Sequence, residues 1–273
     1  MDFAAVNKQI STLEACIQKT GKVSPTEQLY VGVDLGTAYI ILVVLNAKKQ
    51  PVACAMQFAQ VIRDGILVDY VGATTIVQKL TAELEERLGR KLTHAAIAVP
   101  SGTDERTIAT HKHVAESADM EVTAVLDEPS AANAVLQLHD GVIVDIGGGT
   151  TGLAILQNGE VIHVADEATG GTHVSLVLSG NYDIPFAEAE EIKKDASRHK
   201  EIFPVIRPVL QKMGTIVARN IVGFDVSAIY LVGGSSCFDG IEKEIATETG
   251  KPVYKPANPF LVTPLGIALN CKA

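Results

Sequence analysis

The same short pattern occurs twice in this sequence, and the duplication constrains the fold more than any other feature. The segments are DLGT (residues 34–37) and DIGGGT (residues 145–150), and each lies between two apolar runs. Glycine-rich turns let backbone N–H groups approach a phosphate closely, because glycine has no Cβ. An aspartate at the end of a strand can hold Mg²⁺ through its water shell. We therefore predict two related domains whose hairpins together hold a nucleotide polyphosphate.

The composition excludes several other classes of protein. A chain of 273 residues with 47% hydrophobic and 20% charged residues can bury a core, so it is not wholly disordered. A net charge of −9 argues against a nucleic-acid binder, so phosphates would be held by backbone donors and a metal. No apolar stretch approaches the ~18 residues of a membrane span, and the N-terminus lacks a secretory pattern. Four cysteines without C-x-x-C spacing indicate structural thiols and a cytoplasmic location.

The order of predicted elements also repeats. Strands are predicted over residues 30–68, 95–99, 122–126 and 228–232, with an Asn158-Gly159 hairpin of type I′. Helices are predicted around Leu80 and over residues 104–118, 129–138, 172–222, 239–249 and 264–270. Strands that feed helices in this way indicate mixed sheets covered by helices, one in each half. The predicted boundaries are an N-terminal helix and linker (1–28), domain I (29–139 with 258–273) and domain II (140–257).

The first 20 residues carry an apolar seam with spacings of 3, 4, 3 and 4, formed by Phe3, Val6, Ile10, Leu13 and Ile17. This spacing predicts an amphipathic helix. The seam has two possible roles, which the sequence does not distinguish. The helix either packs against its own domain or docks on a partner protein.

Five segments of the chain match a known order of motifs. They are residues 34–37, 128–132, 145–152, 231–236 and 264–268. In this order they resemble the phosphate 1, connect 1, phosphate 2, adenosine and connect 2 motifs of the actin, DnaK-type chaperone and hexokinase superfamily. The resemblance implies an α/β actin-like ATPase fold, with two duplicated ribonuclease-H-like domains. No Walker G-K-[ST] sequence occurs, which excludes a P-loop protein.

The resemblance implies ATP or ADP with Mg²⁺ as cofactors and assigns the catalytic roles. Asp34 and Asp145 would orient the waters around Mg²⁺, and Glu128 would place the attacking water. The alternative for Glu128 is a charge that complements the helix dipole. Donors to the β- and γ-phosphates, with Thr150 also catalytic, would be Gly36, Thr37, Gly147, Gly148, Gly149 and Thr150.

The resemblance also assigns two further groups of residues to contacts with the adenosine of the nucleotide. Gly233, Gly234 and Ser235 would let the nucleoside lie against the backbone, whereas an ordinary tight turn is the alternative. Glu190 and Lys193 would hydrogen-bond the ribose hydroxyls. An i,i+3 surface salt bridge is the alternative for this pair.

The chain also departs from the DnaK-type pattern. No lysine aligns with the one that those chaperones place near the γ-phosphate. Arg63, before Asp64 and Gly65, is the nearby basic candidate and is interpreted as a turn residue. Slow or absent hydrolysis is therefore expected. The peptide-binding domain and lid have no counterpart in the chain, so refolding by the DnaK clamp is not implied.

Length and compactness are most similar to a chaperone-like family of ethanolamine utilisation that is associated with a bacterial microcompartment. This resemblance implies a role in assembling or protecting ethanolamine-degrading enzymes or the microcompartment. The implied partners are ethanolamine ammonia-lyase and shell or cargo proteins, with residues 1–20 as a candidate contact. An actin-like filament-forming or scaffold protein that binds nucleotide is the alternative. A small-molecule kinase would need a substrate pocket for which the sequence shows no signature.

Overall fold

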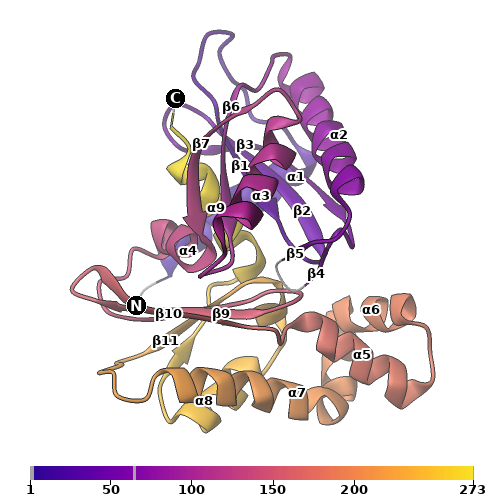
Figure 1. Ribbon diagram of the computed structural model, residues 1–273, viewed down its shortest axis with the longest axis vertical. Helices are drawn as coiled ribbons and strands as arrows, with labels where there is room; N and C mark the ends of the chain where they lie inside the picture. The colour runs from indigo at the N-terminus through magenta and orange to yellow at the C-terminus, as the bar shows by residue number, and fades with distance from the viewer. Residues whose placement is uncertain (1–2, 64–65, 273) are drawn as a thin grey trace. The chain divides into compact units, whose positions relative to one another are not determined.

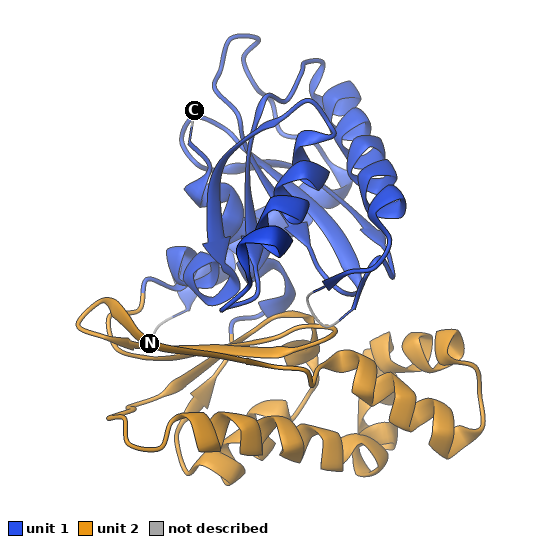
Figure 2. Cartoon of the chain, in the orientation of Figure 1, with its two compact units in different colours: residues 1–137, 256–273 blue, residues 138–255 orange. Residues whose placement is uncertain are grey.

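The computed structural model describes residues 3–63 and 66–272, and the chain forms two compact units (Figure 2). Unit 1 comprises residues 1–137 and 256–273, and unit 2 comprises residues 138–255. Each unit contains a five-stranded sheet, with the orders β3-β2-β1-β6-β7 and β10-β9-β8-β11-β12. In both, the first three strands are antiparallel and the last two join in parallel. The predicted α/β fold with two mixed sheets is confirmed, and the duplication extends over the whole of each sheet.

The sheet of unit 1 consists of β1 (Tyr30–Leu35), β2 (Tyr39–Leu45), β3 (Pro51–Phe58), β6 (His94–Val99) and β7 (Glu121–Asp127). A small hairpin of β4 (Ile62–Arg63) and β5 (Ile66–Leu67) follows β3. The turn predicted at Arg63-Asp64-Gly65 lies partly outside the described residues. The central strand β1 is buried at three consecutive positions, Val31 to Val33, as expected for a strand with helices on both faces.

Helices cover both faces of this sheet (Figure 1). On one face lie α2 (Tyr70–Leu88) and α3 (Glu105–Glu116), whose buried side chains join the main core of unit 1. On the other lie α4 (Glu128–Leu136) and α9 (Val262–Asn270), which follows the 3₁₀ turn Pro259–Leu261. Burial of apolar surface on both faces is the main stabilising contribution here.

The helices α4 and α9 cross at very short range. A Cβ on Gly266 of α9 would overlap the carbonyl oxygen of Ala131 in α4. Both helices start earlier than the sequence predicts. Asp127 caps α4 by accepting a hydrogen bond from the Ser130 N–H (2.9 Å), so the helix begins at Glu128 rather than at Pro129.

The N-terminal helix α1 (Ala4–Gln18) packs against β3. Val6, Ile10 and Leu13 of the predicted seam are buried. Arg87 of α2 holds the end of this helix in place, because its guanidinium donates to the carbonyl oxygens of Cys16 (2.7 Å) and Cys54 (2.9 Å). Of the two alternatives that the sequence left open, the structure shows packing of the seam within unit 1.

Arg87→Met is expected to lower the free energy of unfolding by about 1–3 kcal/mol, because two part-buried carbonyl oxygens lose a charged donor. Urea denaturation would measure the change. The matched control is Arg106→Met on the exposed surface of α3, for which a change within about 0.5 kcal/mol is expected. Equal losses in the two variants would contradict the role assigned to Arg87.

The sheet of unit 2 consists of β8 (Gly141–Ile146), β9 (Thr151–Gln157), β10 (Glu160–Glu167), β11 (Ile229–Val232) and β12 (Val253–Tyr254). Asn158 and Gly159 connect β9 and β10 with φ values of 53° and 80°, which confirms the predicted type I′ hairpin. The short strand β12 was not predicted, because Pro252 and Pro256 leave room for little pairing.

The helices of unit 2 are α5 (Gly171–Tyr182), α6 (Phe186–Lys194), α7 (His199–Asn220) and α8 (Ile241–Thr249), with 3₁₀ turns at Ala196–Arg198 and Gly234–Cys237. Figure 1 shows α7 and α8 side by side along one face of the sheet. Val142, Val144 and Ile146 of β8 point into the core on this helical face. Because side chains alternate along a strand, Asp145 points to the opposite face.

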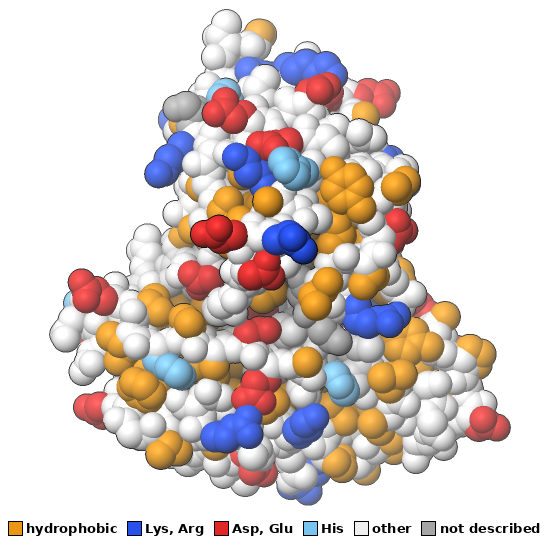
Figure 3. Space-filling model, viewed as in Figure 1, with side chains coloured by type: hydrophobic (Ala, Val, Ile, Leu, Met, Phe, Trp, Pro, Cys, Tyr) orange, Lys and Arg blue, Asp and Glu red, His pale blue; other side chains and the backbone are white. Residues whose placement is uncertain are grey.

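The surface carries charges of both signs. On the face shown in Figure 3, acidic and basic side chains are interspersed, in keeping with a net charge of −9 and no basic surplus. Cys16, Cys54 and Cys271 are buried, whereas Cys237 is exposed. Within the described residues, no helix is both long enough and apolar enough to span a bilayer.

Candidate functional site

The two predicted hairpins have the same backbone geometry. In unit 1 the Gly36 N–H donates to the Tyr39 carbonyl oxygen (3.0 Å), and in unit 2 the Gly147 N–H donates to the Thr150 carbonyl oxygen (3.0 Å). Asp34 pairs with the residue seven positions on (41 − 34), and Asp145 does the same (152 − 145). Each aspartate therefore occupies the same register position, two residues before the first turn glycine.

The start of α5 fixes the carbonyl groups of the unit 2 loop. The Gly171 N–H donates to the Gly147 oxygen (3.0 Å), and the Thr172 N–H donates to the Gly148 oxygen (2.8 Å). A Cβ on Gly170 would lie 2.7 Å from the Gly148 oxygen, so only glycine allows this approach. In a trans peptide group the C=O and N–H point in opposite directions. The N–H groups of Gly148 and Gly149 therefore point away from α5, in position to receive an anion.

The segment predicted to contact adenosine also supports this loop. The Ser235 hydroxyl donates to the Gly147 carbonyl oxygen (2.7 Å). Gly233 has a φ of 87°, and a Cβ there would overlap Oδ1 of Asp145. Asp145 is buried, with 6% of its surface exposed. Gly233 thus allows the carboxylate of Asp145 to lie against the end of β11, a reason that the sequence did not reveal. Gly234 starts the 3₁₀ turn that carries Ser235.

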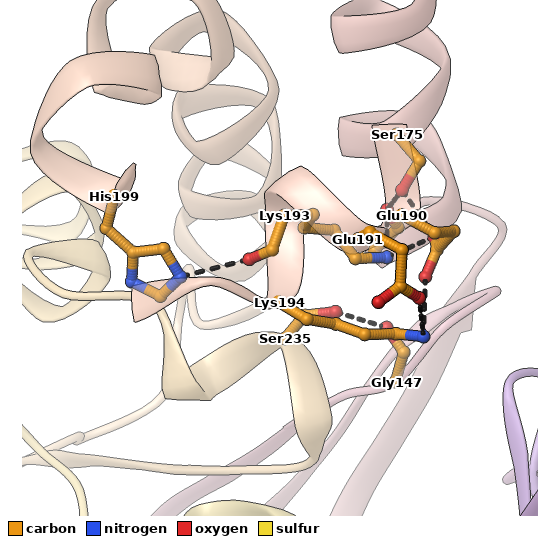
Figure 4. A network of polar contacts seen from close by, with 9 residues as sticks. Gly147, Ser175, Glu190, Glu191, Lys193, Lys194, His199 and Ser235 are labelled. Atoms are coloured by element: carbon orange, nitrogen blue, oxygen red, sulfur yellow. Dashed lines mark hydrogen bonds and ion pairs between the residues drawn. The ribbon is translucent and has the colours of Figure 1, made fainter. Parts of the chain in front are cut away.

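Glu190 and Lys193 of α6 belong to a buried polar network (Figure 4). The Lys193 ammonium donates to Oε1 of Glu190 (2.5 Å) and to the Gly171 carbonyl oxygen (3.2 Å). The Ser175 hydroxyl of α5 donates to the same Glu190 oxygen. Burial lowers the pKa of Lys193, and the charge of Glu190 opposes this effect. The pair is an i,i+3 salt bridge, as the alternative proposed, but Glu190 is buried and Lys193 is half-buried, so it is not a solvated surface pair. Contact with a ribose stays a prediction.

The same network extends to α7. His199, the first residue of α7, places Nε2 3.0 Å from the Lys193 carbonyl oxygen. Its ring stacks on Phe238 with 4.2 Å between the ring centroids. The loop of residues 147–150 is therefore connected to α5, α6 and the Gly234–Cys237 turn through hydrogen bonds that the structure gives directly.

In unit 1 the corresponding residues lie at one edge of the sheet. Asp34 is the next-to-last residue of β1, Gly36 and Thr37 lie in the turn that follows, and Glu128 comes directly after β7. The strands β1, β6 and β7 are parallel, so their carboxyl ends lie at the same edge. Asp34 and Glu128 therefore share this edge, with β6 between their strands.

Sequence reasoning missed two features of the site. The close approach of Gly170 and Gly171 to the loop was not predicted, although a glycine pair before an apolar helix is a signal for close packing. His173 accepts a hydrogen bond from the Gly170 N–H (3.3 Å), which is a helix-start role. Sequence reasoning also missed Asp166 of β10, which pairs with Gly152 of β9 and so lies in one row with Asp145 across the sheet.

The repeated sheet and the paired hairpins define a protein of the actin/HSP70-like ATPase superfamily. MreB5 of Spiroplasma citri, solved bound to ADP, has a TM-score of 0.69 and 18% identity, covering 88% of this chain and 94% of that one. Chaperone protein DnaK of Akkermansia muciniphila is 24% identical over 72% of this chain and 40% of its own length. A family model described as type IV pilus assembly protein PilM matches residues 104–267.

More similar relatives identify the family. Ethanolamine utilization protein EutJ of Salmonella typhimurium is 45% identical over 246 residues, which are 90% of this chain and 86% of that protein. The crystal structure of EutJ from Carboxydothermus hydrogenoformans has a TM-score of 0.90 and 46% identity, covering 97% of both chains. The chain belongs to the EutJ family of ethanolamine utilization proteins, and the resemblance seen in the sequence is confirmed.

Proposed function

We propose that this chain binds ATP and ADP with Mg²⁺, and that the bound nucleotide controls a chaperone-like role in ethanolamine utilisation. The observation that carries the proposal is the unit 2 loop. The N–H groups of Gly148 and Gly149 point away from α5, and the buried Asp145 precedes this loop in the chain. Backbone N–H groups can bind a phosphate without a cluster of lysines. A chain with a net negative charge can therefore bind a polyphosphate at such a loop.

The residues present fit a nucleotide with its metal. A side chain at Gly170 would displace the loop, and a side chain at Gly233 would displace Asp145. The two glycines therefore leave the loop backbone free to form the phosphate-binding surface. Asp145 and Asp34 would hold Mg²⁺ through water, and Thr37 and Thr150 would contact phosphate oxygens. When bound, Mg²⁺ would offset the negative charge of the β- and γ-phosphates.

Slow hydrolysis is part of the proposal. Glu128, directly after β7, would position the attacking water. The chain offers no lysine at the position from which DnaK-type chaperones reach the γ-phosphate. The relatives support nucleotide binding more directly than hydrolysis, since MreB5 of Spiroplasma citri was solved with ADP and with AMPPNP.

The proposed biological role is to assist assembly or protection of ethanolamine-degrading enzymes or of the microcompartment. Membership of the EutJ family supports the pathway. Candidate partners are ethanolamine ammonia-lyase and shell or cargo proteins. Because the seam of α1 is buried, a partner that contacts residues 1–20 would meet the outer, polar face of this helix.

Isothermal titration calorimetry of the intact chain with ATP and ADP, with and without Mg²⁺, tests the nucleotide site. Saturable binding that Mg²⁺ strengthens is expected, and no binding of either nucleotide under any condition would refute the proposal. Co-purification of ethanolamine ammonia-lyase that differs between ATP and ADP would support the chaperone-like role. ATP-dependent sedimentation of the chain alone would favour a filament-forming protein.

A further inference from the structure

The strand β10 forms one edge of the sheet of unit 2, where it pairs with β9 on one side only (Figure 1). From Glu160 to Asp166, no backbone hydrogen bond joins β10 to any described element other than β9. Val161, Ile162 and Val164 of this strand are 43%, 44% and 41% exposed. An edge strand that exposes both backbone groups and apolar side chains is able to pair with a further strand.

The equivalent edge strand of unit 1, β3, is covered by other parts of the chain. The helix α1 packs against it, and the segment after α1 donates a hydrogen bond from the Gly21 N–H to the Val52 carbonyl oxygen (2.7 Å). Arg87 donates to the carbonyl oxygen of Cys54 (2.9 Å), two residues further along the same strand. The duplicated sheets therefore differ at this edge, because among the described residues nothing occupies the outer side of β10 in the same way.

The two remaining edges are also less open to pairing. The C-terminal segment contacts β7, where the Lys272 N–H donates to the Thr123 hydroxyl oxygen (2.9 Å). The strand β12 is two residues long and lies between Pro252 and Pro256. Short edge strands and nearby prolines are features that prevent unwanted pairing.

The register of β9 and β10 shows which backbone groups face outward. Residues 157 and 160 flank the two-residue turn and exchange hydrogen bonds. Two residues further back, β9 faces β10 again and pairs with His163, after a β-bulge at Ile162. Backbone groups of successive residues in a strand point alternately to its two sides. The N–H and C=O groups of Val164 and Asp166 therefore point away from β9.

The charge around this edge indicates the kind of partner. No lysine or arginine occurs from residue 113 to residue 192, a stretch that includes β8, β9 and β10. Glu167 is paired with Arg219 of α7, whereas Glu160 and Asp166 form no ion pair among the described residues. Lysine commonly blocks the edge strands of natural proteins, and β10 has none. A second copy of this chain would bring the same acidic groups to the edge, so the charge favours a basic partner.

We propose that the outer edge of β10 binds an extended segment of another protein, in which apolar residues alternate with lysine or arginine. The backbone of this segment pairs with Val164 and Asp166. Its apolar side chains pack on Val161 and Val164, which lie on one face because they pair with alternate residues of β9. In this mode of recognition the main chain supplies affinity and the side chains supply specificity. The proposal does not depend on nucleotide binding.

Binding of a fluorescent peptide to the intact, nucleotide-free chain tests the proposal. The probe is the synthetic peptide Lys-Val-Thr-Val-Lys-Val-Thr-Lys, measured by fluorescence anisotropy, and saturable binding is expected. Replacing its lysines by glutamates is expected to weaken binding at least roughly tenfold. Two further peptides carry N-methyl groups on the odd or on the even backbone amides. A paired strand donates from one side only, so one of these two is expected to bind roughly tenfold more weakly than the other.

Hydrogen exchange and one substitution locate the bound peptide. The amides of Val164 and Asp166 are expected to gain protection, whereas those of His163 and Ala165 already face β9 and change little. Val164→Lys is expected to weaken binding roughly tenfold, because it repels the basic peptide and blocks the edge. Val71→Lys, at a valine of α2 that is 72% exposed, is the matched control and is expected to bind as the wild type does.

Several results would overturn the proposal: no saturable binding, equal binding of the two N-methylated peptides, unchanged exchange at Val164 and Asp166, or equal losses in the two lysine variants. Sedimentation equilibrium of the chain alone tests the other occupant, and a monomer is expected. A dimer that Val164→Lys dissociates would show that a second copy occupies the edge, which would also overturn it. Titration with ATP separates this proposal from the proposed function, since a chain that binds the peptide but no nucleotide would refute only the latter.

Discussion

Asp145→Asn is expected to lower the Mg²⁺-dependent affinity for ATP by roughly 10–100-fold, the range found when a group that orients metal-bound ligands is removed. Asparagine is the informative replacement, because the side chain of Asp145 is buried and lies against Gly233, where a smaller residue would leave a cavity. The amide keeps the shape of the carboxylate and removes its charge, so a loss of affinity reports on the metal rather than on a cavity. Calorimetric titration of ATP with and without Mg²⁺ would measure the change.

The duplicated hairpin provides a second, equivalent variant for this test. Asp34→Asn in unit 1 occupies the same register position as Asp145→Asn in unit 2 and is expected to have an effect of the same kind. Asp225→Asn, on the exposed surface of unit 2, is the matched control and is expected to bind ATP as the wild type does. Normal Mg²⁺-dependent affinity in both hairpin variants would show that the assigned site is wrong.

Gly266→Ala is expected to lower the free energy of unfolding by at least about 1–3 kcal/mol, the cost of overpacking a close contact. The added methyl group would overlap the carbonyl oxygen of Ala131. That oxygen belongs to the backbone of α4, so it cannot move away as a flexible side chain could. α9 would have to move away from α4, and the shift would open the buried contacts of Ile267 and Cys271. Urea denaturation would measure the change.

Gly180→Ala in α5 is the control for helix propensity. No atom lies within 4 Å of a Cβ at this position, so the substitution is expected to raise stability by about 0.5–1 kcal/mol. If Gly266→Ala were as stable as the wild type, the close crossing of α4 and α9 would be incorrect.

Local patterns were sufficient to predict most elements and the two hairpins. The DLGT and DIGGGT segments predicted equivalent turns, and the structure gives them the same closing hydrogen bond and the same register. Pro129 and Pro264 indicated helices at the correct places but suggested late starts. In α4, the cap comes from Asp127, two residues before the proline.

The features that were missed depend on contacts between distant parts of the chain. Side chains alternate between the two faces of a sheet, so a regular pairing of β9 and β10 would place Asp166 on the face opposite to Asp145. The bulge at Ile162 shifts the register and moves Asp166 to the face of Asp145. The approach of Gly170 to the loop required α5 to be placed. Glu190 and Lys193 had a spacing that fits a solvated pair, whereas Ser175 and Gly171 of another helix enclose them.

The hydrogen bonds to the carbonyl oxygen of Gly147 couple the loop to the elements around it. This oxygen accepts hydrogen bonds from both Gly171 and Ser235, so one atom joins the loop, the start of α5 and the 3₁₀ turn after β11. Lys193 reaches the carbonyl group of that same Gly171 from α6. A displacement of the turn would therefore strain α5 and α6 together. A fluorescent label on the outer surface of α6 should respond to occupancy of a loop that it does not touch.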